Sequence, residues 1–461
     1  MTTLHRVDYS GTLTLLTPLH LGSGEERIED LPGDDGACRR IALILRDHEK
    51  KPHIPATSLK GVLRRLEPDD NLRKLLFGQH EGDDPRMGAL LVRGARLTQC
   101  GRAIGAGASD RHGVYLSTRT AIDAGRGVVL PNHLFTQELL GPGATFALRL
   151  RLECCAEKSE FTELDKALRA ILSKLMSQDG VGLGADGADG GGRLRLEGNV
   201  TRRRFTTSKP TGRFCLDPGA QTTIAWSPAA PPSANHRLVL TCRDPYLSVD
   251  DTYRSPAGQA DEDKVHLMAL RDGGVPWISA SALSGVLRAR MNWLLQLDAL
   301  RQTHSVDPDG MVERLFGSDL LNSKADSGSR KRRKGVVSLR VHPAKREQDC
   351  RFSSIRIDRF SGGVIENALY TTDADTGTVF EAELTLDARG TEQDRAALDR
   401  LVADLCKNGL MLGHGSSRGF GWFTVAEAAT PEVVPVPPAA EPEPARPPLG
   451  RPHTRHGRRR R

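Results

Sequence analysis

The sequence lacks several features that define common functional classes. Its 8 cysteines form no CxxC pair and no ordered framework, which argues against a zinc ribbon or a disulfide scaffold, so we expect them to be reduced and mostly buried. No apolar run is long enough to cross a bilayer. The first residues lack the features of a secretory signal, so we expect a cytoplasmic protein. Aromatic residues are only 5% of the chain, which argues against a stacking platform as the main device for holding bases.

Positive charge is concentrated at the end of the chain. Of the formal net charge of +7, residues 431–461 supply more than half, because they hold seven arginines against three acidic residues. They also hold nine prolines, so we expect a disordered Pro- and Arg-rich tail over 428–461. A phosphate-binding surface elsewhere must come from local clustering. The basic run 330–334 is interpreted as a solvated loop, with contact to a phosphate backbone as the alternative.

The most informative feature is an internal duplication. Five blocks of the first half return in the same order in the second half, which is hard to obtain by chance. The paired blocks are PHIPATSLKGVLRR at 52–65 with PWISASALSGVLRA at 276–289, the LFG turns ending at Gly78 and Gly317, the segments ending at Phe135 and Tyr370, GATFALRLRL at 143–152 with GTVFEAELTL at 377–386, and the glycine-rich loops ending at Gly192 and Gly421.

Hydrophobic periodicity gives each copy the order strand, helix, two or more strands, helix, strand. This βαββαβ order predicts an α+β fold made of two tandem ferredoxin-like modules. We expect the first module at 1–205, a linker at 206–232, the second module at 233–427 and the tail at 428–461.

The glycine-rich loop of each copy invites two interpretations. Residues 182–187 fit GxGxxG, but a helix precedes this loop and a strand follows it, which is the reverse of a dinucleotide-binding turn. The loop at 413–419 has the same reversed order. Glycines let a backbone approach a phosphate chain closely, whereas the alternative is a tight helix-to-strand turn. The presence of the loop in both copies favours ligand contact.

The first predicted helix of each copy carries basic residues and an internal glycine. Lys60 and Arg64 are four residues apart and therefore share one helix face; Arg288 keeps the arginine in the second copy, where Ser284 replaces the lysine. A glycine inside a helix costs roughly 1 kcal/mol relative to alanine, so Gly61 and its counterpart predict a close approach by another group. Helix-on-sheet packing with solvated basic residues is the alternative.

Together these motifs resemble the RAMP superfamily (repeat-associated mysterious proteins), specifically the backbone subunits of type III CRISPR effector complexes. The resemblance spans nearly all of residues 5–427, and two modules in one chain look like the fused subunits of some type III systems. It is carried by LHLGSGE at 19–25, IPATSLKGVLR at 54–64, the LFG turn, the blocks at Asp123 and Asp358, and the glycine-rich loop before the last strand.

The resemblance implies that the helices and glycine loops hold a CRISPR guide RNA. It also implies a projecting thumb hairpin, at the Asp123 and Asp358 blocks, that interrupts guide–target pairing. The implied partners are guide RNA, target RNA and other backbone, large and small subunits, with no membrane. The RNA-binding residues expected on this basis are Ser58, Lys60, Arg64, Arg119, Gly184, Gly190, Arg288, Arg356, Gly413, His414, Gly415, Ser417, Arg418 and Gly419.

The family also implies cleavage of target RNA with a divalent metal and an aspartate on the loop after the first strand. A carboxylate there would hold Mg²⁺ or orient the attacking 2′-hydroxyl. Aligning Pro18 with Pro245 places Asp34 opposite Asp261. We therefore expect Asp34 and Asp261 as metal ligands, and no organic cofactor. The expected catalytic residues are Asp34, Asp35, Asp261 and Asp263, with Asp30, Asp250 and Asp251 in reserve.

Two alternative functions remain open at this point. Some relatives process guide RNA without metal and use histidine as a general base, which directs attention to His20. Leu247 occupies the equivalent position of the second copy, and a structural role for the histidine is the preferred interpretation. The third possibility is an architectural subunit that holds RNA and cuts nothing.

Overall fold

The protein is described by a computed structural model. The described residues are 3–30, 38–79, 85–107, 109–122, 129–184, 190–208, 215–224, 234–253, 264–300, 307–318 and 334–428. Within them no helix has the length and apolar character needed to span a membrane. The structure mixes helices and strands and is rich in sheet, so the predicted α+β class is confirmed.

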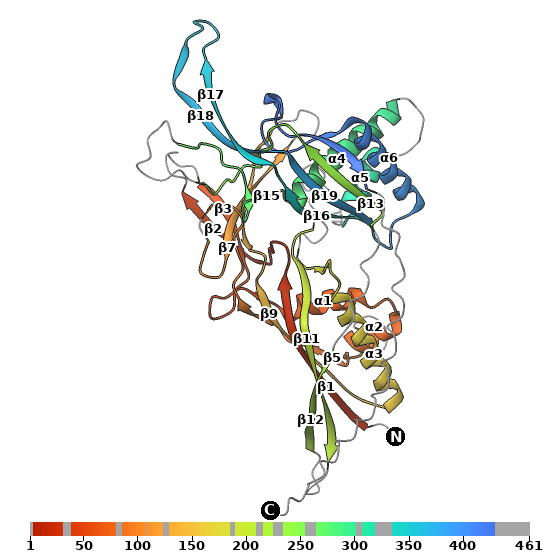
Figure 1. The fold of residues 1–461 in the computed structure, drawn as a ribbon. Coiled ribbons are helices and arrows are strands. Elements are labelled where there is room, and N and C mark those ends of the chain that lie inside the picture. Colours follow the sequence, from red (N-terminus) through yellow and green to blue (C-terminus); the bar gives the residue numbers. More distant parts are fainter. Residues whose placement is uncertain are drawn as a thin grey trace, which may run out of the picture. The chain divides into compact units, whose positions relative to one another are not determined.

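The first half contains one large sheet, a smaller sheet and three helices (Figure 1). Its elements are β1 (Thr3–Leu15), β2 (Gly22–Asp30), β3 (Cys38–Ile44), β4 (His53–Ile54), α1 (Ala56–Leu66), α2 (Asp70–Phe77), β5 (Leu90–Val92), β6 (Ala95–Gln99), β7 (Val114–Ile122), β8 (Val129–Leu140), β9 (Thr145–Ala156), α3 (Lys158–Leu175), β10 (Val181–Gly182), β11 (Arg193–Ser208) and β12 (Cys215–Ile224). The large sheet has the order β10-β11-β1-β9-β6-β4, and β5 pairs with β9.

The second half repeats the central part of this arrangement. Its elements are β13 (His236–Cys242), β14 (Arg271–Asp272), β15 (Val275–Pro276), α4 (Ala280–Leu300), α5 (Pro308–Phe316), β16 (Val337–Lys345), β17 (Gln348–Ile357), β18 (Val364–Thr376), β19 (Thr378–Leu386), α6 (Glu392–Asn408), β20 (Leu410–Met411), the 3₁₀ turn η2 (Ser416–Arg418) and β21 (Trp422–Glu427). The sheet order is β16-β19-β13-β21-β20. In each half the first strand lies between the last long strand and the strand before the last helix, and both pairings are antiparallel.

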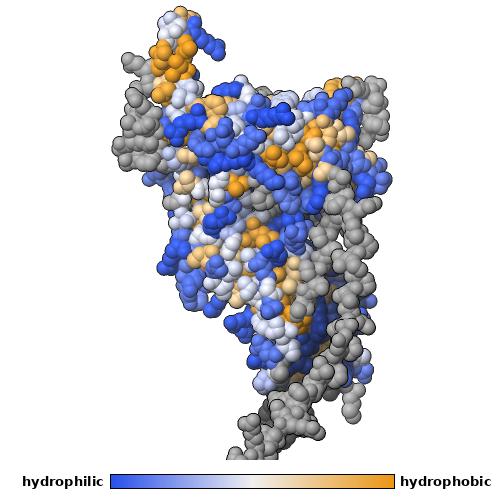
Figure 2. All heavy atoms as spheres, in the orientation of Figure 1, coloured by the Kyte–Doolittle hydropathy of each residue, from blue (hydrophilic) through white to orange (hydrophobic). Residues whose placement is uncertain are grey.

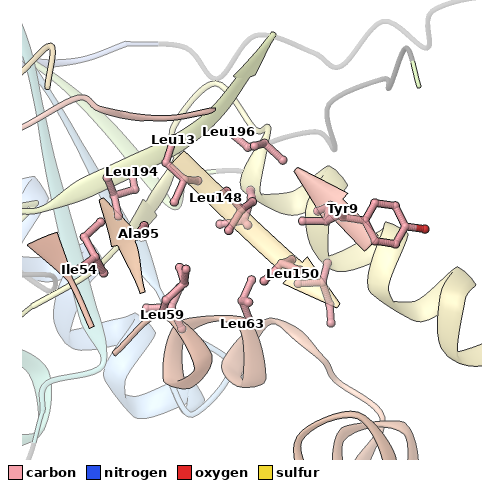
Figure 3. Close-up of a cluster of buried hydrophobic side chains, with 14 of the residues drawn as sticks. Tyr9, Leu13, Ile54, Leu59, Leu63, Ala95, Leu148, Leu150, Leu194 and Leu196 are labelled. Atoms are coloured by element: carbon pink, nitrogen blue, oxygen red, sulfur yellow. The ribbon is translucent and has the colours of Figure 1, made fainter. Parts of the chain in front are cut away.

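Each half has its own hydrophobic core between its sheet and its helices. Alternate residues of β9 are buried because successive side chains of a strand point to opposite faces. On the helix side, Leu59 and Leu63 of α1 are one turn apart and point toward Leu148 and Leu150 of the sheet (Figure 3). Burial of each such leucine stabilises the fold by about 1.5–3 kcal/mol. The helical spacing of its leucines therefore places the apolar face of α1 against the sheet.

A hairpin extends from each half. In the first half, β7 and β8 form a hairpin that joins β2 and β3 in a four-stranded sheet of order β2-β3-β8-β7. In the second half, β17 and β18 form a separate two-stranded hairpin that projects from the module (Figure 1). The blocks at Asp123 and Asp358 belong to these two regions, although Asp123 itself lies outside the described residues.

The structure adds detail to one expectation and overturns another. The segment expected to be a linker, 206–232, contains strand β12, which pairs antiparallel with an extension of β11. The extension of β11 has backbone N–H and C=O groups at the sheet edge that need hydrogen-bond partners, and pairing with β12 supplies them. The cysteines were expected to be mostly buried, and this is wrong for the seven whose side chains the structure describes: all seven are free thiols, and among them Cys242 alone is buried. Several of the others lie at outward-facing positions of strands, which the composition alone does not reveal.

Candidate functional site

The glycines inside α1 and α4 have open space in front of them. Among the described residues, a Cβ atom built on Gly61 would meet no heavy atom within 4 Å, and the same holds for Gly285 at the equivalent position of α4. The opposite side of α1, with Leu59, Val62 and Leu63, is buried against the sheet. Packing by the described residues therefore does not explain either glycine, and each leaves an exposed stretch of helix backbone in this part of the structure.

Basic side chains flank this bare stretch in the first half. Lys60 and Arg64 are half-buried side chains of α1, as is Ser58 in the turn before them. Within the described part of the chain, neither Lys60 nor Arg64 has an ion-pair partner. The counterpart of Arg64 in α4, Arg288, is used differently, because its guanidinium donates to the Gly317 carbonyl oxygen over 2.9 Å. The two helices therefore share their glycine and this arginine, but the arginine of α4 is engaged by a backbone carbonyl of its own half.

The glycine loops close onto the turn after the first strand of each half. A Cβ on Gly184 would lie 2.7 Å from the carbonyl oxygen of His20, and one on Gly413 would lie 2.5 Å from that of Leu247. Both glycines have positive φ, +88° and +89°, which favours glycine on its own. The backbone conformation and the nearby carbonyl oxygen therefore explain why glycine recurs at this position in both halves.

Gly190 has a similar explanation. Its φ is +74°, and a Cβ there would lie 2.8 Å from the Leu339 carbonyl oxygen of the second half. Its own carbonyl oxygen accepts a hydrogen bond of 2.9 Å from the Thr17 hydroxyl. This residue, expected to bind RNA, packs against β16 instead of facing solvent.

The remaining part of the second loop is exposed. Gly415 and Gly419 have left-handed conformations on either side of η2, and a Cβ on Gly419 would meet nothing within 4 Å. His414, Ser417 and Arg418 are exposed on this turn. Arg418 lies 5.5 Å from the ring centroid of Phe420. Partial desolvation of the ring by neighbouring groups, together with the Arg418 cation, lowers the pKa of His414 although its side chain remains largely exposed. At neutral pH the loop therefore offers one fixed positive charge beside a neutral imidazole.

The expected catalytic aspartates, Asp34, Asp35, Asp261 and Asp263, lie outside the described residues. Of the reserve candidates, Asp30 ends β2. Among the described residues no group of three or more His, Cys, Asp or Glu side chains is arranged to hold a metal ion.

Asp250 and Asp251 are occupied by contacts with the first half. Asp250 is 4% exposed and accepts hydrogen bonds from the backbone N–H groups of Ala106, at 2.5 Å, and of Thr252, at 3.0 Å. Asp251 accepts from the backbone N–H of Thr118 over 3.0 Å, and burial raises its pKa. One oxygen of each carboxylate therefore accepts a hydrogen bond from the first half, and the other Asp250 oxygen accepts from Thr252 of its own loop.

The ring of His20 is held in place. Its Nδ1 lies 2.8 Å from the carbonyl oxygen of Glu138 in β8, and its Nε2 lies 3.1 Å from where a Cβ on Gly22 would be. One ring nitrogen is therefore committed to a backbone contact, as expected for a structural histidine.

The hairpin β17–β18 carries an exposed apolar face that the sequence analysis did not identify. Ile355 pairs with Leu369 and Ile357 with Val364 across the two strands. Their exposed fractions are 52%, 37%, 55% and 62%, and Phe360 at the tip is fully exposed. Figure 2 shows these apolar side chains at the projecting end of the hairpin. The sequence does hold a signal for this face, because Ile355 and Ile357 alternate with Arg356 and therefore share one side of a strand. In the structure that side is exposed.

The other expected hairpin residues have local roles or lie at exposed positions. Arg119 of β7 is opposite Phe135 of β8, and Arg356 is exposed on β17. Asp358 accepts hydrogen bonds from the backbone N–H groups of Phe360 and Ser361, which fixes the tip turn and lowers the pKa of this carboxyl. The basic run is described only from Lys334 onward, and the tail from 429 lies outside the described residues.

Comparison with known families gives one match. The family described as RAMPs, the RAMP superfamily, matches residues 12–195 and 255–424, which together make up more than half of the chain. One matched region lies in each half of the duplication. No curated protein matches the sequence.

Proposed function

The chain belongs to the RAMP superfamily, and on this premise we propose that it is a guide-RNA-binding backbone subunit of a type III CRISPR effector complex. Each half would be one ferredoxin-like module, and sequence would be read by pairing between guide and target. The protein itself would recognise the RNA backbone and its shape.

The observation that carries the proposal is the pair of glycines Gly61 and Gly285. Both lie in helix interiors, where glycine is unfavourable by about 1 kcal/mol, and both face open space. Both helices therefore keep a destabilising glycine that the described residues do not require for packing. We infer that an external partner approaches the helix backbone closely at both positions. The cationic groups beside Gly61 give that partner the character of a polyanion.

The matched substitutions Gly61→Ala and Gly285→Ala test this directly. Without RNA we expect each variant to be more stable to urea by about 0.5–1 kcal/mol, because alanine favours the helix and no atom obstructs its methyl group. With guide RNA we expect at least about tenfold weaker binding for the double variant. A double variant that is stabilised and still binds RNA with unchanged affinity would refute the proposed contact.

The type III assignment is tested by the RNA that copurifies with the protein. We expect sequencing to find a repeat-derived handle followed by varied spacers. Bulk cellular RNA in its place would contradict the proposal.

We further propose that the apolar face of β17–β18 is the thumb that interrupts guide–target pairing. Apolar side chains inserted between bases unstack them at a cost of a few kcal/mol per step, which exposed apolar surface on a narrow hairpin can offset. The variant Ile357→Ser with Val364→Ser should keep guide binding and weaken target binding. Ser354→Ala, on the same strand, is the matched control and should change neither.

Cleavage is a separate proposal, in which Asp34, Asp35, Asp261 and Asp263 support Mg²⁺-dependent cutting of target RNA. Alanine at all four positions should abolish cutting while guide and target RNA remain bound. Unchanged cutting by this variant would refute the assignment. A wild-type complex that binds target but does not cut it would favour the architectural alternative.

A further inference from the structure

The returning strand of each hairpin is tied to the turn after the first strand of its half. In the first half the N–H of Leu140, in β8, donates to the Leu19 carbonyl oxygen over 2.9 Å, and the Leu19 N–H donates back over 3.0 Å. In the second half Asp375, in β18, and Tyr246 exchange the same two hydrogen bonds, at 2.9 and 2.7 Å. Leu140 and Asp375 correspond in the duplication, since each lies five residues after the end of a paired block. The bases of the two hairpins are therefore equivalent.

An arginine binds a carboxylate beside each of these bases. In the first half Arg46 donates to Glu138 of β8 over 3.4 Å. In the second half Arg271 donates to Asp373 of β18 over 2.5 Å. The two carboxylates correspond in the duplication, because each lies three residues after its paired block. The two arginines correspond in the structure, because each is the antiparallel bridge partner of the proline that opens the duplicated helix block. We call these two ion pairs the hairpin clamps.

The second clamp is the more extensive one. Arg271 also donates from Nε to Asp375 over 2.9 Å, and Arg346 donates to the same carboxylate over 2.7 Å. Asp373 and Asp375 are two residues apart on one strand, so their side chains lie on the same face and one planar guanidinium reaches both. The hairpin β17–β18 forms a sheet of two strands, whereas β7–β8 is joined by β2 and β3. The hairpin with fewer neighbouring strands therefore has the larger set of ion pairs.

The clamp carboxylates are largely withdrawn from water. The side chain of Asp375 is 1% exposed, that of Asp373 11% and that of Glu138 10%. A buried ion pair stabilises a fold little compared with an apolar contact of the same size, because both charges lose their hydration. Stability alone therefore does not explain why a clamp occurs in both halves. Its hydrogen bonds supply direction, since they fix how the two segments that they join are oriented.

We propose that Arg46 and Arg271 are positioning residues, which set the direction of the two hairpins and thereby determine which target bases the hairpins separate from the guide. The inference rests on the proposed thumb role of β17–β18, extends that role to β7–β8, and adds the residues that orient both. Because each clamp belongs to one hairpin, each should govern one position of the target.

Hydrogen exchange of the full-length, RNA-free protein tests the clamps themselves. Arg271→Lys keeps a positive charge beside the buried carboxylates but lacks the planar fork that reaches both of them. We expect the backbone amides at the base of β18 to exchange at least about tenfold faster in this variant, because a charge-assisted hydrogen bond is lost. Arg46→Lys should have a smaller effect on β8, which the neighbouring β3 supports. Arg395→Lys, at an exposed ion pair of α6, is the matched control and should leave both hairpins unchanged.

The guide-bound complex tests the effect on the target. The probe is 2-aminopurine, an adenine analogue whose fluorescence rises when it is unstacked, moved along the target RNA one position at a time. Wild type should give two bright positions, one for each hairpin. Arg271→Lys should lose one of them and keep the other, and Arg46→Lys should weaken the other one. A role of the arginines in stability alone would not separate the two positions in this way.

Unchanged hydrogen exchange in Arg271→Lys would overturn the inference, and so would faster exchange with both bright positions intact. Absence of bright positions from wild type would instead refute the thumb proposal and with it the effect on the target. The exchange result alone would then decide whether the clamps hold the hairpins.

Discussion

The two halves of the molecule agree in their backbone contacts and differ in their exposed side chains. The N–H of Gly192 donates to the Pro18 carbonyl over 2.7 Å, and the N–H of Gly421 donates to the Pro245 carbonyl over 2.8 Å. The hairpins differ, since one belongs to a four-stranded sheet and the other stands as two strands with an apolar face. The difference teaches that the contacts that close the loops have been kept after duplication, while the outward surfaces have been free to change.

The largest effect is expected from breaking a contact that both halves share. Gly421→Ala would place a Cβ 1.8 Å from the Leu412 carbonyl oxygen, and Gly192→Ala would place one 2.1 Å from that of Leu183. Both residues also have positive φ. We expect each change to reduce the free energy of unfolding by about 3 kcal/mol or more, measured with urea. Gly143→Ala, with positive φ but open space, is the control and should cost only about 1–2 kcal/mol.

A smaller effect is expected at the start of the last helix, where the halves differ. Asp394 of α6 is fully buried and accepts from the Thr391 backbone N–H and hydroxyl, at 2.7 and 2.8 Å, and from Arg314. The corresponding helix α3 has no side-chain cap. Asp394→Asn should lower the stability of the second half by about 2 kcal/mol at pH 7, as measured by urea unfolding.

The pH dependence of that variant sharpens the comparison. Burial acts to raise the pKa of Asp394, but the hydrogen bonds from Thr391 and the Arg314 guanidinium outweigh it and hold this pKa below the ordinary value of 3.8. A depressed pKa contributes stability above the ordinary value, which is lost as pH falls through the folded value. The difference in stability between wild type and Asp394→Asn should therefore shrink below pH 4. A constant difference from pH 7 to pH 2 would contradict the assignment.

The contact between the halves should give a still smaller effect. Asp250→Ala leaves the Ala106 N–H without its acceptor, which should cost about 1.5 kcal/mol. The counterpart of Asp250 in the first half is Ser23, which donates to the Leu43 carbonyl instead, so Ser23→Ala is the matched control and should cost less. Urea unfolding measures both. If target cleavage is present in wild type, it should persist in Asp250→Ala, and its loss would return this aspartate to the catalytic candidates.

The smallest effect is expected from exchanging the basic residue that distinguishes α1 from α4. Lys60→Ser should reduce the slope of log affinity against log salt concentration by about 0.7, the amount expected for one phosphate contact on a single strand. Ser284→Lys should increase the slope by a similar amount. RNA affinity measured at several salt concentrations gives both slopes. A slope that stays unchanged in both variants would contradict a phosphate contact at this helix position.

Features that depend on local periodicity were predictable from the sequence. The apolar face of α1, with Leu59 and Leu63, follows from helical spacing, and the strand alternation of β9 follows from its period of two. The duplication itself was visible because it repeats residues in order. The hairpin regions were located through the blocks at Asp123 and Asp358.

Features that depend on contacts between distant segments were not predictable. The recurrence of Gly184 and Gly413 has a cause that the sequence does not reveal, since each lies against the backbone of its own module. The reverse holds for Gly61, where no described residue makes the close approach that the sequence led us to expect. In the sequence nothing distinguishes Asp250 from other loop aspartates, whereas in the structure it accepts a hydrogen bond from the Ala106 N–H of the first half. Sequence alone does not reveal which backbone atom faces a given residue.

The contact between the halves combines an apolar cluster with polar groups, and this has a consequence for how the chain is held together. The cluster joins Ile104, Tyr115 and Leu139 of the first half with Leu270 and Trp277 of the second. Covalent linkage gives two attached modules an effective concentration in the millimolar range, so even this small contact is formed most of the time. The ion pair between Asp179 and Arg340 then helps to set the relative register of the modules. Separate chains at micromolar concentration have no such help and need a contact with more buried apolar area to stay associated.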